Sequence, residues 1–187
     1  MKYFTPELYV RFNSHDDDVA DAADDEWEKQ IKMYRKHYKR LERQLPEELR
    51  RFHNEQCLHD ADVEGPLIVQ PFSLPWSPRY AVIAARQINT LIPEFLNTVA
   101  VLFYEVTDEP VIEKSVSAPV FRSVQPIWLY EEEDVIKPGL FEQEILISDG
   151  RVIKIRFRDF HYSIVPLKQE AAAAEKPRKP ARRAASA

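Results

Sequence analysis

The sequence predicts an α+β domain in which an N-terminal helical segment packs on one antiparallel meander sheet of about six or seven strands. Over residues 1–60 the apolar side chains recur every three or four positions, which is the period of a helix. From residue 64 the period falls to about two, and β-branched and aromatic residues cluster. Turn sequences rather than helices separate the expected strands, so neighbouring strands must run antiparallel. We therefore expect one domain at residues 1–167, with its β-rich part at 64–167.

Three helices are expected in the first 60 residues. A short helix at about 6–12 follows Thr5, a typical N-cap residue, and has Pro6 at its first position. A long helix at about 17–44 begins among acidic residues and ends among basic ones, which matches the helix macrodipole. Its basic face is expected to be solvated rather than to bind nucleic acid, because no aromatic side chains interleave the lysines. A third helix runs from Pro46 to about 56, with Leu49 and Phe52 facing inward. The long helix has one apolar stripe, which is expected to be buried: Trp27, Ile31, Tyr34, Tyr38, Leu41 and Leu45.

Seven segments are expected to form strands: Leu67–Phe72, Arg79–Arg86, Thr98–Thr107, Val111–Val116, Ile127–Val135, Leu140–Ile147 and Val152–His161. Proline, glycine and acidic residues form turns between most of them. A helical turn within 87–97 remains an alternative reading of that stretch. The expected inward-facing residues of the sheet are Val69, Val82, Val101, Phe103, Leu129, Ile145, Ile153, Ile155 and Phe157.

The hairpin around Gly150 gives the most specific structural prediction. A two-residue loop would place Ile145 opposite Lys154, so that apolar residues face charged ones along the ladder. A three-residue loop, 148–150, instead pairs Ile145 with Ile153 and Glu144 with Lys154. Such a loop needs its last residue in the left-handed region, which suits glycine. We therefore predict the three-residue loop and a positive φ at Gly150.

The C-terminal segment 168–187 is expected to be a disordered basic tail, because it contains no large apolar residue. It carries six basic and two acidic side chains, so residues 1–167 have a net charge of −9 against −5 for the whole chain. An acidic body favours a basic protein partner. Any contact of the tail with nucleic acid is expected to be weak and non-specific.

Several common kinds of site are absent from the sequence. Its three glycines are too far apart for a phosphate-binding loop, and it has no Gly-x-Ser-x-Gly nucleophile turn. The single cysteine, Cys57, excludes an intrachain disulfide and a multi-cysteine zinc site. No apolar run approaches the length of a membrane span, and the N-terminus does not resemble a signal peptide. We therefore expect a cytoplasmic protein with no membrane contact and no cofactor.

A first group of chemically versatile side chains lies at the junction of the third helix and the first strand. His53, Cys57 and His59 are candidate metal ligands, since imidazole and thiolate are ligands that zinc prefers. A structural junction is the favoured alternative. In that reading Cys57 and Leu58 anchor the helix end in the core, and Asp60 or Asp62 caps the turn.

A second group is the acidic run 131–134, which follows Trp128-Leu129-Tyr130. On a strand, Glu131 and Glu133 point to one face and Glu132 and Asp134 to the other. Paired carboxylates can perform acid–base chemistry or hold a divalent cation. We favour a solvated sheet face beside the basic residues of the last strand.

A third group is Asp159 and His161 near the end of the last strand. Strand alternation places Asp159 on the same face as Phe157, among apolar residues, and His161 two residues further on the same face. A carboxylate in such surroundings needs a partner or a functional reason. Catalysis and a polar closure of the strand end are both open, and closure is favoured because no nucleophile lies beside the pair.

Five short segments together carry a resemblance to a known family: Met1–Thr5, Leu58–Ala61, Trp128–Tyr130, Ile145–Gly150 and Ile155–Phe160. Over about residues 1–165 the chain resembles an uncharacterised bacterial family, a domain of unknown function. The resemblance implies no established activity, cofactor or catalytic residue. Some small bacterial α+β proteins of this appearance are immunity proteins that neutralise a toxin, which is an analogy of fold alone.

The sequence therefore favours a non-enzymatic cytoplasmic binding or interaction protein, with an immunity-like role as one form of it. The alternative is a small metal-dependent enzyme or hydrolase that uses His59, Asp60, Asp159 and His161. That alternative requires the helix–strand junction to lie close to the end of the last strand.

Overall fold

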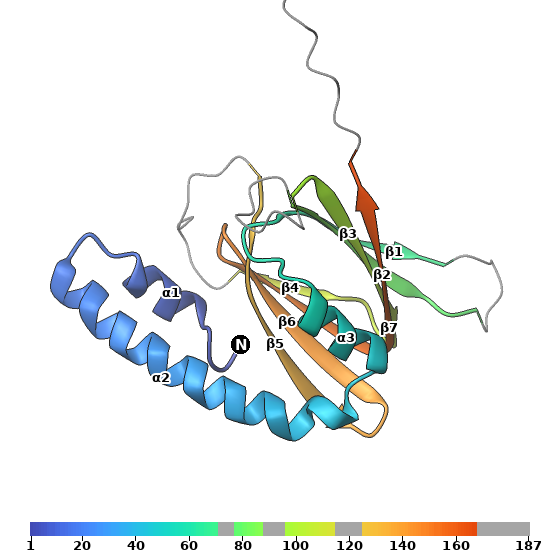
Figure 1. Cartoon of the computed structure of the whole chain (residues 1–187), viewed down its shortest axis with the longest axis horizontal. Coiled ribbons are helices and arrows are strands. Elements are labelled where there is room, and N and C mark those ends of the chain that lie inside the picture. The colour runs from blue at the N-terminus through green and yellow to red at the C-terminus, as the bar shows by residue number, and fades with distance from the viewer. Residues whose placement is uncertain (71–76, 88–95, 115–124, 168–187) are drawn as a thin grey trace, which may run out of the picture.

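The computed structural model describes residues 1–70, 77–87, 96–114 and 125–167, and it confirms the α+β fold (Figure 1). Three α-helices form the N-terminal part, and the antiparallel sheet follows. The expected disordered tail at 168–187 lies outside the described residues, as do most of the alternative helical turn at 87–97 and the ends of two expected strands. Among the helices of the described residues, none is long and apolar enough to cross a membrane.

The helices begin and end close to the expected positions. Helix α1 (Pro6–Phe12) is capped by the Thr5 hydroxyl, which accepts a hydrogen bond of 3.2 Å from the Leu8 N–H. Helix α2 (Asp17–Leu41) is capped by the Asp16 carboxylate, and a 3₁₀ turn (Glu42–Gln44) completes the segment expected at 17–44. Helix α3 (Glu47–Glu55) follows Pro46. Side-chain acceptors at α1 and α2 and a proline before α3 thus mark the three starts.

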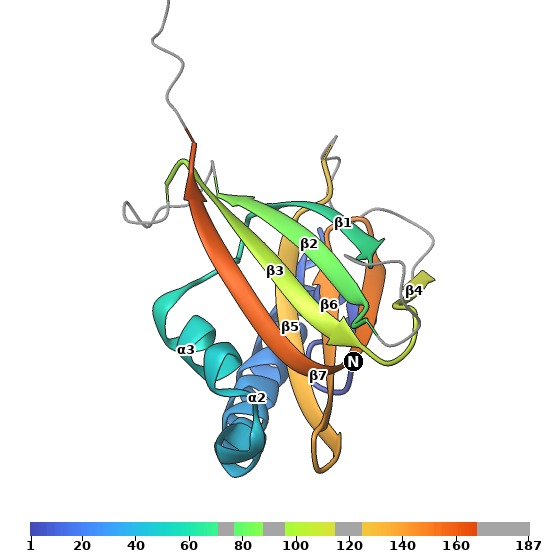
Figure 2. The same ribbon diagram turned by 90° about the vertical axis from the view of Figure 1, so that its right-hand side faces the viewer.

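The strands are β1 (Asp62–Val69), β2 (Tyr80–Gln87), β3 (Thr98–Val106), β4 (Val111–Lys114), β5 (Trp128–Lys137), β6 (Leu140–Ile147) and β7 (Arg151–Pro166). Two meanders, β1–β2–β3 and β5–β6–β7, join through the pairing of β3 with β7, and the short β4 also pairs with β7. The sheet curls until its two ends meet, as Figure 2 shows. There the Trp128 N–H donates to the Ala61 carbonyl at 2.9 Å, and the Val63 N–H donates to the Pro126 carbonyl at 2.8 Å. The curled sheet therefore has an enclosed inner face.

The hairpin between β6 and β7 has the predicted three-residue loop. Ile145 pairs with Ile153 and Glu144 with Lys154. Gly150 has a φ of 81°, and its N–H donates to the Ile147 carbonyl at 2.9 Å. This pairing confirms the predicted register. The register forms because it alone places apolar side chains opposite one another on the inner face.

The expected inward-facing residues are correct for β6 and β7 but wrong for β1–β3. Leu129 on β5 is also wrong, because it is buried in the cluster on the outer face. Val69 is exposed, and Val82, Val101 and Phe103 are only half-buried. The buried residues of β2 and β3 are the alternate ones: Ala81, Ile83, Ala85, Ala100, Leu102 and Tyr104. Three of these six are alanines, which suits a concave surface where the tight curl brings inner side chains close together. Hydrophobicity alone favoured the larger residues and so selected the wrong face.

A β-bulge changes the alternation of β7. The register against β3 shifts between the pairs Glu105–Asp159 and Val106–Phe157, so Arg158 is the extra residue. Phe157 and Phe160 are both buried, and Asp159 is half-exposed. The expectation that Asp159 shares the inner face with Phe157 is therefore wrong, because a bulge moves every later side chain to the opposite face.

Helix α2 packs on β5 and α3 packs on β7, and two apolar clusters result. One fills the inner face of the sheet and includes Leu41, Leu49 and Phe52. The other joins α1 and the first half of α2 to the outer face of β5 and β6, and includes Trp27. Between these clusters Ile31, Tyr34 and Tyr38 are only half-buried, although a continuous buried stripe was expected. The expected stripe is buried at both ends and half-open in the middle, where α2 borders a pocket.

Candidate functional site: a pocket between α2, α3 and β5

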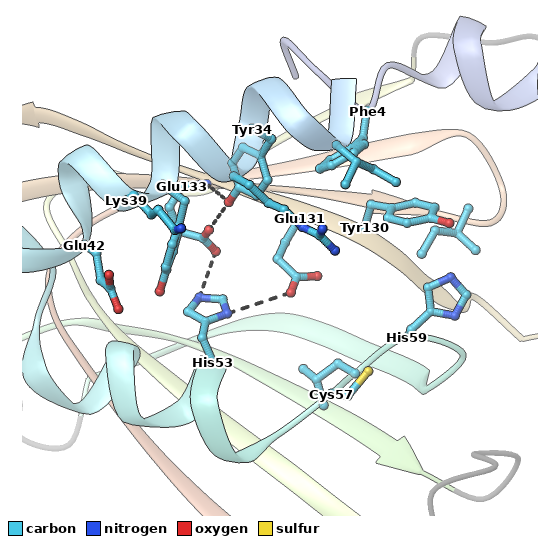
Figure 3. Close-up of a pocket in the computed structure, with 15 residues that line it drawn as sticks. Phe4, Tyr34, Lys39, Glu42, His53, Cys57, His59, Tyr130, Glu131 and Glu133 are labelled. Carbon is cyan, nitrogen blue, oxygen red and sulfur yellow. Dashed lines mark hydrogen bonds and ion pairs between the residues drawn. The ribbon is translucent and has the colours of Figure 1, made fainter. Parts of the chain in front are cut away.

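A pocket of about 640 Å³ lies between α2, the end of α3 and β5 (Figure 3). Helix α2 contributes Tyr34 and Tyr38, the end of α3 contributes His53, and β5 contributes Glu131 and Glu133. The space has a polar corner where the carboxyl groups meet the imidazole, and an aromatic end near Phe4 and Tyr130.

The ion pair of Glu133 with His53 forms the deepest part of the polar corner. Oε1 of Glu133 lies 3.0 Å from Nε2 of His53, although the ring N–H is not aligned for a hydrogen bond with this oxygen. The same oxygen accepts a 2.8 Å hydrogen bond from the Gln143 amide, and Oε2 accepts one from the Tyr34 hydroxyl. The Glu133 side chain is only 1 % exposed. These donors offset the loss of hydration of a buried carboxylate.

The pKa values of this pair show that both members are charged. Burial alone lowers the pKa of His53, but the nearby carboxylate of Glu133 outweighs it and raises the pKa to about 9. Burial alone raises the pKa of Glu133, but His53 together with the hydrogen bonds from Tyr34 and Gln143 lowers it below the ordinary value. At neutral pH the pair is an imidazolium beside a carboxylate.

Glu131 completes the cluster but is held less tightly. Its Oε2 accepts a 2.6 Å hydrogen bond from the indole N–H of Trp128. Its Oε1 lies 3.9 Å from Nδ1 of His53, and the side chain is 28 % exposed. Burial raises the pKa of Glu131 above its ordinary value, and the Glu133 carboxylate adds to this, while His53 and Trp128 offset only part. Glu131 thus shares the His53 imidazolium with Glu133, and it lies farther from that cation than Glu133 does.

A chain of hydrogen bonds through the interior fixes the position of Glu133. The Tyr104 hydroxyl on β3 donates to Oε1 of Gln143 at 2.5 Å, and Gln143 on β6 donates to Glu133 on β5. The Tyr34 hydroxyl on α2 both donates to the Glu133 carboxylate and accepts 3.1 Å from the Glu133 N–H. Burial, and then the Glu133 charge, raises the pKa of Tyr34, so its hydroxyl keeps its proton. The network connects three strands to α2 and makes the polar corner rigid.

The neighbouring acid, Glu132, has a structural role on the outer face of β5. It is buried, and its carboxylate accepts hydrogen bonds of 2.6–2.7 Å from the backbone N–H groups of Lys2, Tyr3 and Phe4. These bonds hold Phe4 at the aromatic end of the pocket. The expectation of a solvated face for the acidic run is therefore wrong at Glu132 and Glu133. At these two positions β5 is buried on one face by the sheet interior and on the other by the N-terminal segment, whereas Asp134 is exposed.

The proposed metal ligands His53, Cys57 and His59 all line the pocket. The closest polar partner of His53 is Glu133, whereas His59 lies 3.1 Å from the Asp60 carboxylate and edge-on to the Tyr130 ring. In the part of the chain that the structure describes, no three His, Cys, Asp or Glu side chains are placed to hold a metal ion. Cys57 is exposed, so the idea that it anchors the helix end in the core is wrong, and buried Leu58 has that role.

The candidate catalytic residues form two pairs with separate partners. Asp159 and His161 lie together on β7, with Oδ2 and Nε2 3.4 Å apart, and both are half-exposed. Nδ1 of His161 lies 3.0 Å from the Glu48 carboxylate on α3. Within the described residues, no hydrogen bond or ion pair connects this pair to His59 and Asp60. The contact of His161 with Glu48 joins β7 to α3 at the surface, and Asp159 contacts His161 within β7.

Sequence reasoning identified the two halves of the site without joining them. His53 and the acidic run were separate candidates, and Tyr34, Trp128 and Gln143 were not recognised as parts of a polar site. One signal was present in the predicted hairpin register. With Ile145 on the inner face, Gln143 must also point inward, and a polar residue among apolar ones requires a partner.

Comparisons of the chain with protein-family models, with curated proteins and with solved structures found no match.

Proposed function

We propose that this protein is a non-enzymatic, cytoplasmic binding protein whose ligand is a small molecule held in the pocket between α2, α3 and β5. The observation that carries the proposal is the combination of about 640 Å³ of open space with a rigid polar corner, in which Glu131 still faces that space. Pockets for small organic ligands measure about 300–1,000 Å³ and combine apolar walls with a few fixed polar groups.

The make-up of the polar corner supports a binding role. A buried ion pair contributes little to stability compared with apolar residues of the same volume. Here two carboxyl groups and an imidazole stand at the wall of a pocket, and the carboxyl of Glu131 has a perturbed pKa. Perturbed titratable groups that line a cleft are typical of functional sites. A basic protein partner and an immunity-like role remain weaker proposals, since they rest on net charge and on analogy of fold.

The single cysteine offers a direct test. Cys57 is exposed and lines the pocket, so its alkylation by iodoacetamide reports whether the pocket is occupied. A library of small fragments is screened for compounds that slow this reaction and raise the melting temperature. We expect some compounds to do both.

The control for this screen moves the thiol to α2, outside the pocket. A variant with Cys57→Ser and Lys32→Cys carries its thiol at an exposed position, where pocket ligands should leave the alkylation rate unchanged. If no compound protects Cys57, or if every compound protects both positions equally, the proposal is wrong.

One observation favours a second function, acid–base catalysis. Glu131, with its raised pKa, lies 3.9 Å from a protonated imidazole inside a pocket, which is an arrangement that can donate a proton. An enzyme of this kind would lose its turnover in the Glu131→Gln variant. The same variant would still bind ligands that do not contact the Glu131 side chain. A ligand that leaves the pocket chemically unchanged in the wild-type protein supports the binding role instead.

A further inference from the structure

We infer that the ligand of this pocket is an amine with an apolar or aromatic body, whose ammonium group binds the Glu131 carboxylate. This inference rests on the proposed function and adds the chemical class of the ligand.

The fixed charge in the polar corner is unbalanced. Two carboxyl groups share one imidazole there, and His53 lies closer to Glu133, at 3.0 Å, than to Glu131, at 3.9 Å. The other oxygen of Glu131 is held by a neutral donor, the indole N–H of Trp128. A ligand with a cationic group would supply the charge that Glu131 lacks, and an anionic ligand would be repelled by both carboxylates.

Two positively charged side chains, Arg35 and Lys39, also line the pocket. Both side chains are exposed on α2, and neither forms an ion pair with Glu131 or Glu133 in the described structure. Long side chains at exposed positions can turn their charged ends into water at small cost. The carboxyl groups, in contrast, are fixed by hydrogen bonds. The fixed charge of the pocket is therefore acidic, whereas its basic charge is mobile.

Aromatic side chains line much of the pocket. Phe4, Tyr34, Tyr38 and Tyr130 line the space around Glu131, and Figure 3 shows Tyr130 and Phe4 beyond it at the far end of the pocket. Aromatic rings attract an ammonium group through their faces and accept an apolar body by contact. Ile31 and Leu129 extend this apolar surface. A carboxylate beside several rings thus suits an amine whose remainder is apolar.

The test compares three probes of one shape and different charge: 2-phenylethylamine, 2-phenylethanol and phenylacetate. Their affinities for the full chain at pH 7 are measured by NMR titration and by protection of Cys57 from alkylation. We expect the amine to bind at least about tenfold more tightly than the alcohol, as one partly desolvated charge pair provides, and phenylacetate to bind most weakly.

Two variants identify the group responsible. Glu131→Gln keeps an oxygen for the Trp128 N–H but removes the charge, and it should reduce the preference for the amine to within about twofold. Asp134→Asn makes the same change at an exposed position of the same strand and should keep the preference. Melting temperatures check that both variants fold. The comparison of the three probes on the wild-type protein does not depend on either variant.

Each outcome decides the inference. Equal binding of the three probes, tightest binding of phenylacetate, or an unchanged preference in Glu131→Gln overturns the assignment of an amine. If none of the three binds but another fragment protects Cys57, the ligand class is wrong and the binding pocket stands. If no fragment of any charge protects Cys57, the proposed function itself fails.

Discussion

The Glu133–His53 pair should make the stability of this protein depend on pH, and the substitution Glu133→Gln should remove this dependence. Glu133→Gln keeps the shape of the side chain and removes its charge. In the wild-type protein His53 has a pKa of about 9 when folded, against 6.5 for an unperturbed histidine. Because the folded-state pKa is raised, the stabilisation is fully present below pH 6.5 and is lost as the pH rises through 9.

The size of this effect follows from the difference between the two pKa values of His53. Each unit corresponds to about 1.4 kcal/mol, so between pH 6.5 and 9 the wild-type protein should lose about 3 kcal/mol of unfolding free energy. In Glu133→Gln the pKa of His53 should fall to its ordinary value or below, because burial then outweighs the more distant Glu131. The variant should be less stable by about 3–5 kcal/mol at pH 6, since a buried charge is left without its partner.

The assay is urea unfolding at several pH values between 5.5 and 9.5, together with NMR titration of the His53 ring. The matched control is Glu48→Gln, which removes a carboxylate 3.0 Å from His161 at the surface of the same helix. An exposed pair of this kind is worth less than about 1 kcal/mol, so the control should follow the wild-type profile. A wild-type His53 that titrates near its ordinary pKa, or parallel pH profiles for wild type and Glu133→Gln, would refute the reasoning.

Four further substitutions test the packing, the hairpin and the pocket. Leu49→Ala should lower the unfolding free energy by about 2–5 kcal/mol in urea titrations, whereas Ile31→Ala should cost clearly less, because Leu49 is fully buried and Ile31 is half-open to the pocket; equal losses would place Ile31 in the core. Gly150→Ala should destabilise the hairpin by about 1–2 kcal/mol, since a φ of 81° is strained for any residue with a Cβ, and an unchanged melting temperature would argue against the turn. Cys57→Trp should abolish the binding of fragments that protect the wild-type thiol and leave the melting temperature nearly unchanged, because the side chain lies at an exposed position of the pocket lining; retained affinity would exclude this pocket as the site.

Local patterns were sufficient to predict the helices and most of the strands, because these were marked by their own chemistry. The first strand is an exception, since β1 begins at Asp62, five residues before the expected start at Leu67. Thr5 caps α1 and Pro46 precedes α3, as expected from their positions in the sequence, and α2 begins within the acidic segment expected at its start, where Asp16 is the N-cap. The hairpin register could be predicted because only one loop length brings the apolar and the charged partners of both strands together. These features depend on residues that are neighbours in the sequence or across one tight turn.

The curl of the sheet could not be predicted in the same way. It depends on contacts between the start of β1 and the start of β5, such as the hydrogen bond from Trp128 to Ala61, and these residues are far apart in the sequence. Once the sheet is curled, the inner face of β2 and β3 accepts Ala81 and Ala100 where hydrophobicity favoured Val82 and Val101. The bulge at Arg158 had no marker such as glycine, so the alternation of β7 was extended past the point where it reverses.

The site was missed for a related reason, and the error itself is informative. The acidic run reads as a solvated surface, because four consecutive acids rarely lie in a core. Three of its members instead have separate roles. Glu132 binds the N-terminal backbone, Glu133 forms the ion pair with His53, and Glu131 faces the pocket. A fold that required only a stable interior would place apolar residues at two of these three positions. The sequence departs from that simpler solution where the structure has an open pocket. Glu131 faces this pocket and lies 3.9 Å from the His53 imidazole, against 3.0 Å for Glu133. It is therefore the residue at which a function for this protein is best sought.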